Sequence, residues 1–202
     1  MNHLIYLRNE FKELDLINST FHDLPLSLHI ELQESLYQLD DSGNINFDYF
    51  DTIYSRATDI FKDLFINEDQ LFFVTVARSE KAISKPIGLF NKFINRINQY
   101  KLHTFEENDE FGRLVQYSLQ TQKKFLHYNK IIKAICNQDF KDLTPRFNDK
   151  LLSTYPEVFF INKDKGIIFH IYDDRGAFLL FNDEKLHKEF AMKYSNLIRR
   201  EE

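Results

Sequence analysis

The stretch EVFFINKDKGIIFHIYDDRGAFLLF, residues 157–181, decides the fold. It holds three short runs rich in β-branched and aromatic residues, at about 157–162, 166–172 and 177–181. The segments between them, NKDKG and DDRG, are turn sequences that each end in glycine. Strands this close in sequence cannot be joined by crossover helices, so they must run antiparallel. We therefore predict two consecutive hairpins of an antiparallel sheet.

Amphipathic segments elsewhere in the chain predict helices that cover this sheet. The clearest is residues 47–65, where apolar side chains recur at i, i+3, i+4 and i+7 from Phe47 to Phe65. Further helices are predicted over residues 3–15, 86–97, 128–137 and 183–198. Further strands are predicted over residues 26–33, 70–78 and 113–122. The fold class is α+β, and residues 1–202 are expected to form a single domain with its helices on one side of an antiparallel sheet.

The composition is that of a folded protein with a large aromatic core. The 202 residues include 21 Phe and 10 Tyr, and each buried ring removes roughly 150–250 Å² from water. The one cysteine, Cys136, lies in the apolar run IIKAICNQ, which predicts a reduced core thiol. The N-terminus has no signal-peptide pattern, and no apolar run approaches the roughly 20 residues that span a bilayer. A cytoplasmic protein without membrane contact is expected.

The charge is divided unevenly along the chain. Residues 1–120 hold 11 Lys and Arg against 19 Asp and Glu, a balance of −8, whereas residues 121–202 have a balance of +3. Direct nucleic-acid binding is disfavoured because it needs excess cations. An acidic surface would instead attract a basic protein partner, although an ordinary solvated surface is the alternative. The partner-binding residues predicted on this basis belong to one acidic loop, and they are Glu106, Glu107, Asp109 and Glu110.

Motifs that would compel a reaction are missing from the sequence. It has no glycine-rich phosphate loop, no H-E-x-x-H, and too few cysteines for a thiolate zinc site. No catalytic residue, metal or cofactor is therefore expected. The adjacent acids Asp173 and Asp174 leave three alternatives open: a structural turn, a partner-binding tip, or a metal or catalytic site.

Three short motifs carry a resemblance to a known family. They are NQDF at residues 137–140, PRF at 145–147 and YDDRG at 172–176. Together they resemble the bacterial domain of unknown function numbered 3885, and the similarity extends more loosely over residues 26–196. His29 stands where that family carries an arginine, which is a departure from its pattern.

The resemblance implies a small bacterial protein and points to motif residues in two loops. These residues are Asp139, Arg146, Asp173, Asp174 and Arg175. Families of this kind are associated with immunity proteins encoded beside polymorphic toxins, as in contact-dependent growth inhibition. The first hypothesis is thus a non-catalytic immunity protein that binds a cognate toxin domain, such as a basic nuclease. The alternatives are a regulatory domain with another protein partner, or an enzyme that uses these loops to hold metal and phosphate. The sequence leaves the oligomeric state open.

Overall fold

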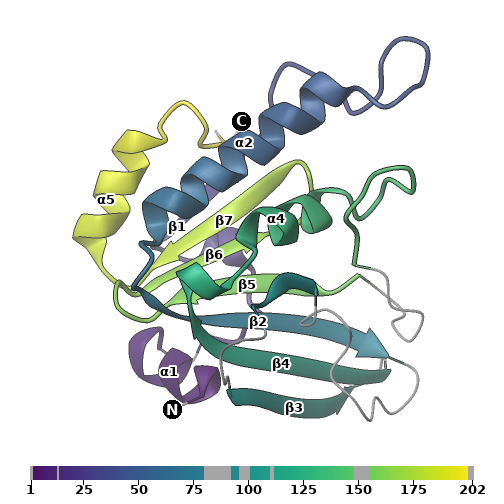
Figure 1. Cartoon of the computed structure of the whole chain (residues 1–202). Helices are drawn as coiled ribbons and strands as arrows, with labels where there is room; N and C mark the ends of the chain where they lie inside the picture. Colours follow the sequence, from purple (N-terminus) through teal and green to yellow (C-terminus); the bar gives the residue numbers. More distant parts are fainter. Residues whose placement is uncertain are drawn as a thin grey trace.

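The computed structural model describes residues 2–12, 14–79, 92–95, 101–109, 112–147 and 155–199. Within them a seven-stranded antiparallel sheet has the strand order β1-β7-β6-β5-β2-β4-β3 (Figure 1). The strands are β1 (Ser27–Glu31), β2 (Gln70–Ser79), β3 (Lys101–Asp109), β4 (Gly112–Gln122), β5 (Glu157–Asn162), β6 (Ile167–Ile171) and β7 (Gly176–Phe181). The predicted α+β fold is confirmed.

The two C-terminal hairpins are formed as the sequence predicts. Asn162 pairs with Ile167 across the first turn, and Ile171 pairs with Ala177 across the second. Gly166 in the first turn has a φ of 64°, a conformation that favours glycine. Every residue of β6 is buried, because this strand lies inside the sheet and both of its faces are covered.

Among the described residues, three helices cover one face of the sheet: α2 (Phe47–Leu64), α4 (Tyr128–Cys136) and α5 (Glu184–Lys193) (Figure 1). Asn46 caps α2, and its side chain accepts a hydrogen bond from the Tyr49 amide. The apolar stripe of α2 packs into a core that includes Ile53, Phe61 and the sheet residue Phe160. Cys136 is fully buried in this core, as predicted.

The opposite face of the sheet has a cover of its own, which corrects the prediction that helices pack on one side only. It consists of α1 (His3–Glu10), the 3-10 helix η1 (Phe21–Asp23) and the segment between them. Phe72 and Phe159 from the sheet pack in this second core. The reason is that the central strands present apolar side chains on both faces, so both faces must be shielded from water.

Two predicted helices end earlier than the sequence pattern indicated, and a third is mostly outside the described residues. α1 stops at Glu10, shortly before Lys12 takes a positive φ of 50°. α5 stops at Lys193, and residues 197–199 then run along the outer edge of β1. Of the helix predicted over 86–97, only residues 92–95 are described. Among the described residues, no helix combines the length and apolar character needed to cross a membrane.

Candidate functional site

The YDDRG motif forms the turn between β6 and β7, and its first acid is neutralised within the turn. Asp173 Oδ1 accepts a hydrogen bond of 2.8 Å from the Arg175 amide. Asp173 Oδ2 accepts a second bond of 2.8 Å from Arg175 Nε and also contacts Arg175 Nη2. The Asp173 side chain is 8% exposed and that of Arg175 is 69% exposed. Arg175 therefore lies at the surface and compensates the charge of a buried carboxylate.

The second acid, Asp174, points away from this pair toward the start of α2. Its Oδ2 accepts a hydrogen bond of 2.7 Å from the Tyr49 hydroxyl and one of 3.1 Å from Gln38 Nε2. Burial raises the pKa of Asp174 above its ordinary value, because the charged form loses its hydration. The two adjacent acids thus have separate partners and do not form a catalytic dyad.

The backbone of the same turn holds the end of β1. The Arg175 carbonyl accepts a hydrogen bond of 2.9 Å from the Leu32 amide, and the Leu32 carbonyl accepts one of 2.9 Å from Arg56 Nη1. A Cβ at Gly176 would lie 2.7 Å from the Ile30 carbonyl oxygen, so only glycine fits there. The motif therefore fixes where the chain leaves β1 and enters residues 32–46, which we name the β1–α2 loop.

The segment after α4 docks onto this turn. Gln138 Nε2 donates a hydrogen bond of 3.1 Å to the Tyr172 carbonyl. Arg146 Nη2 donates to the Gln138 carbonyl at 2.9 Å and to the Tyr155 hydroxyl at 2.5 Å. The NQDF, PRF and YDDRG motifs are thus adjacent in space, and the contacts that join them brace backbone rather than line an open site.

The five motif residues have different environments. Asp139 is exposed, Arg146 binds a backbone carbonyl and a tyrosine, and Asp173 and Asp174 are buried with partners inside the protein. In the parts of the chain that the structure describes, no group of three or more His, Cys, Asp or Glu could hold a metal ion. The arrangement suits a structural clamp better than a reaction centre.

The predicted partner-binding residues that the structure describes lie in a strand, which corrects the prediction that they form a loop. Glu106, Glu107 and Asp109 all belong to β3, the outermost strand on one side of the sheet, and Glu110 lies outside the described residues. The polar composition predicts a loop, but an edge strand also accommodates charges because one side of it remains unpaired. Charged edges also discourage pairing with other chains.

The acids of β3 are divided between the two faces of the sheet. Glu106 lies opposite Val115, on the face covered by α2 and α4, and forms an ion pair with Arg113. Glu107 lies opposite Leu114, on the face covered by α1, because successive side chains alternate across a strand. Glu106 and Glu107 therefore do not share one face of the sheet.

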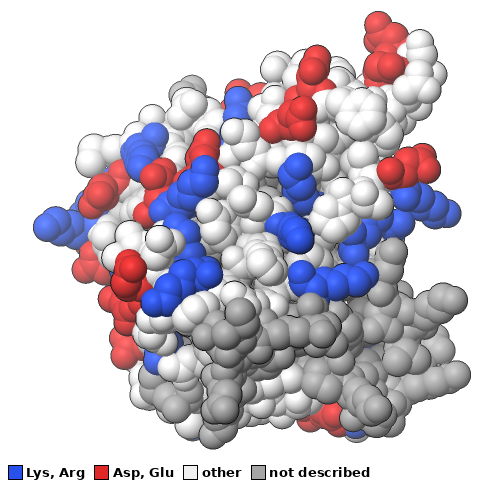
Figure 2. Space-filling view, viewed as in Figure 1, with Lys and Arg blue, Asp and Glu red and all other residues white. Residues whose placement is uncertain are grey.

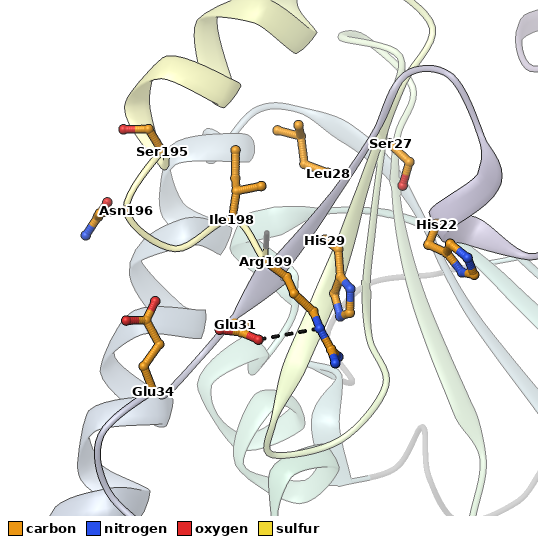
Figure 3. A pocket seen from close by; sticks show the side chains of 10 residues that line it. All are labelled: His22, Ser27, Leu28, His29, Glu31, Glu34, Ser195, Asn196, Ile198 and Arg199. Carbon is orange, nitrogen blue, oxygen red and sulfur yellow. Dashed lines mark ion pairs between the residues drawn. The ribbon is translucent and has the colours of Figure 1, made fainter. Parts of the chain in front are cut away.

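A polar pocket lies at the opposite edge of the sheet, outside β1 (Figure 3). The chain after α5 forms one wall, where Arg199 Nε lies 3.7 Å from Glu31 Oε1. His29 from β1 is half-buried, contacts the Tyr172 hydroxyl at 2.8 Å and stacks on Phe178. Burial lowers the pKa of His29 below its ordinary value. The lining mixes opposite charges and does not converge on one ligand chemistry.

Sequence reasoning missed the residues that connect the motif to the β1–α2 loop. Tyr49 and Gln38, the two partners of Asp174, were not singled out. Phe47 was placed on the buried stripe of α2 but is 67% exposed, because it is the first helical residue and lies at the projecting end of α2 (Figure 1). A hydrogen bond between buried polar residues of distant segments produces no periodic pattern in the sequence, so these partners could not be predicted.

Comparisons with known proteins agree with these motifs. The chain is 31% identical over 210 residues to the uncharacterized protein YnaE of Bacillus subtilis (strain 168), an alignment that covers 98% of this chain and 97% of that protein. No solved structure matches. The family model described as "Domain of unknown function (DUF3885)" matches residues 4–201. The chain therefore belongs to the DUF3885 family.

Proposed function

We propose that this protein is a non-catalytic immunity protein that binds and neutralises a basic toxin domain. The observation that carries the proposal is that the buried carboxylates of the family motif bind partners within the fold, whereas other carboxylates are exposed at the surface. Asp173 and Asp174 are buried and satisfied within the fold, so the family motif has a structural task. The acidic excess lies elsewhere, in residues 1–120, and its exposed carboxylates are available to a partner.

Electrostatic complementarity suits this role. An acidic surface accelerates capture of a basic protein and discriminates against acidic ones. Many toxin domains that act on nucleic acids are basic because they bind phosphate, and an acidic inhibitor can cover such a site. The toxin as partner follows from the family association described above, and the charge distribution supports a basic one.

The test is capture of the tagged full chain from its own cells, followed by mass spectrometry. We expect one stoichiometric partner with a basic domain, and the complex should weaken between low and high salt because exposed charges are screened. The isolated domain should inhibit growth, and co-expression of this protein should restore it. A partner that is harmless to the cell would contradict the immunity function.

A regulatory domain with another protein partner is the second candidate. This candidate would use the same binding surface, but its captured partner would not be toxic and co-expression would not rescue growth. An enzyme would need the motif residues in one pocket, whereas Asp139 is exposed and Asp173 and Asp174 bind Arg175 and Tyr49. That separation favours a binding protein over an enzyme of the phosphate- or metal-dependent kind.

A further inference from the structure

The β1–α2 loop and the first turn of α2 project beyond the sheet (Figure 1). They carry large apolar side chains that are exposed to water. Tyr37 is 80% exposed, Phe47 is 67% exposed and Leu39 is 48% exposed. Single exposed apolar residues are common on protein surfaces and need no explanation. Several on one projecting element are typical of a surface that another molecule covers.

The backbone of the loop places Tyr37 and Leu39 on one face. Leu39 and Ile45 form an antiparallel bridge, and the Asn46 amide donates to the Gln38 carbonyl at 2.9 Å. Side chains alternate along an extended strand, so Tyr37 and Leu39 belong to the same face of this arm of the loop. On the other arm, Ile45 packs partly against the main core, and Phe47 is the first residue of α2.

The loop is also fixed in position before any partner binds. Asn46 Nδ2 donates to the Tyr37 carbonyl at 3.0 Å, and Gln38 is held by the buried Asp174. At the tip, Asp40 Oδ1 accepts hydrogen bonds of 2.9 Å from the Ser42 and Asn44 amides. A loop that is already ordered loses little conformational entropy on binding, which favours affinity.

The charged side chains of the β1–α2 loop and of the first half of α2 are all acidic. Residues 33–55 contain five acids and no Lys or Arg. All five acids are exposed, and they are Glu34, Asp40, Asp41, Asp48 and Asp51. Figure 2 shows red and white but no blue on the projecting loop, in contrast to the blue side chains elsewhere on the helical face. The charge of this surface is therefore complementary to a cationic partner.

We infer that the exposed surface of the β1–α2 loop and of the first turn of α2, with Tyr37 and Phe47 as apolar anchors, is the surface that docks a basic partner protein. The inference rests on the proposed function and names its binding surface, in place of the acids of β3. Aromatic anchors provide most of the affinity in protein interfaces, and rim charges provide selection and speed. A symmetric contact between two copies would bring the acidic rims together, so a second copy of this chain is not the occupant.

The experiment is a selection of displayed random peptides on the purified full chain, followed by binding measurements on variants. The enriched peptides should combine Lys or Arg with an aromatic or aliphatic residue. Their affinity should fall at least about tenfold for Tyr37→Ala and for Phe47→Ala. Met192→Ala is the matched control, because Met192 is 75% exposed on α5 and should leave binding unchanged. Asp40→Asn with Asp41→Asn should weaken binding and reduce its salt dependence.

Several outcomes would overturn the inference. They are enrichment of no peptide, enriched peptides without basic residues, equal loss of affinity in the Met192 control, or a wild-type dimer in gel filtration that Tyr37→Ala dissociates. These variants change exposed side chains, so we expect their thermal unfolding to match that of the wild type. This measurement shows that a loss of binding does not come from a loss of the fold.

The growth assay separates this inference from the proposed function. If a toxin is captured and the double variant Tyr37→Ala, Phe47→Ala still rescues growth, the immunity function stands and this surface is wrong. If the peptides behave as expected but no captured domain is toxic, the surface stands and the immunity function is wrong.

Discussion

The hydroxyl of Tyr49 donates a hydrogen bond of 2.7 Å to Asp174 Oδ2 and so connects residues that are 125 positions apart in the chain. Tyr49 lies in the first turn of α2, and Asp174 lies in the turn between β6 and β7. Both side chains are buried, with 3% exposure each. This contact attaches the helical layer and the β1–α2 loop to the motif that marks the family.

We expect Tyr49→Phe to destabilise the protein by about 1–3 kcal/mol, because a buried carboxylate loses a donor. Asp174→Asn keeps the shape and an acceptor oxygen, so its cost should be smaller than that of Asp174→Ala. A double-mutant cycle of Tyr49→Phe and Asp174→Ala, measured by urea unfolding, should give a coupling energy of about 0.5–3 kcal/mol. A coupling near zero would mean that the hydrogen bond contributes nothing to stability.

The pH dependence of Asp174→Asn should differ from that of the wild type in a defined direction. Burial raises the pKa of Asp174 in the folded state, so burying its charge is a cost that is present above this pKa and is relieved as pH falls through it. The asparagine variant lacks this cost at every pH. Its stability relative to the wild type should therefore increase as pH rises from about 4 to 7. A constant difference across this range would contradict the raised pKa.

Two buried histidines should destabilise the fold in mild acid. Burial lowers the pKa of His3 and of His170 from 6.5 to about 4, despite the contact of His3 with Gln116 and of His170 with the Val158 carbonyl. The unfolded chain binds these protons near pH 6.5, so the stability is fully present above that pH and is lost as pH falls toward 4.

The loss amounts to at most roughly 3 kcal/mol for each histidine, since one pKa unit is about 1.4 kcal/mol. Replacing His170 with Asn should reduce the pH dependence of the free energy of unfolding between pH 6.5 and 4, whatever the change in absolute stability. Urea unfolding at several pH values will measure the slope. The ionisable neighbours of the two histidines remain in the variant. Glu157 Oε2 lies 3.9 Å from His170 Nε2, and His103 interacts with His3. An unchanged slope would mean that His170 titrates normally in the folded protein.

Gly176→Ala should destabilise the protein by more than about 2 kcal/mol. The new methyl group would lie 2.7 Å from the Ile30 carbonyl oxygen and 2.2 Å from the Tyr172 hydroxyl, so β1 and β7 would have to separate. Gly43→Ala is the control, because its φ is 79° but no atom lies within 4 Å of the added Cβ. That variant should cost about 1 kcal/mol from backbone conformation alone. Equal thermal shifts for the two variants would contradict the packing argument.

Arg146→Ala should loosen the segment after α4. The arginine bonds the Gln138 carbonyl and the Tyr155 hydroxyl, and the loss of these contacts should cost about 1–2 kcal/mol. Amide hydrogen exchange of residues 138–147 should become faster. Lys141→Ala, an exposed change in the same segment, should stay within about 0.5 kcal/mol. Similar exchange rates in both variants would show that Arg146 does not brace this segment.

Most strands and most helices could be predicted because their signals are local. Alternation and turn residues located β5, β6 and β7, and the helical stripe located α2 with its end displaced by one residue. Helix ends were less accurate, since the positive φ at Lys12 and the return of residues 197–199 along β1 depend on packing. The acidic composition of β3 predicts a loop, because edge strands and loops are both rich in charged residues.

The candidate site required the tertiary structure. The sequence showed that NQDF, PRF and YDDRG mark the family, and it left the role of Asp173 and Asp174 open. Only the fold determines that adjacent carboxylates face different partners, one in its own turn and one on a distant helix.

The sequence by itself determined the antiparallel sheet, the amphipathic helices and the uneven charge. These properties follow from side-chain periodicity and from composition, which do not depend on distant contacts. The tertiary structure decided which acids are buried, which are exposed, and that Tyr37 and Phe47 remain in water beside them. The physical reason is that burial and pairing depend on contacts between residues far apart in the chain. Local sequence patterns do not show which of these residues come together.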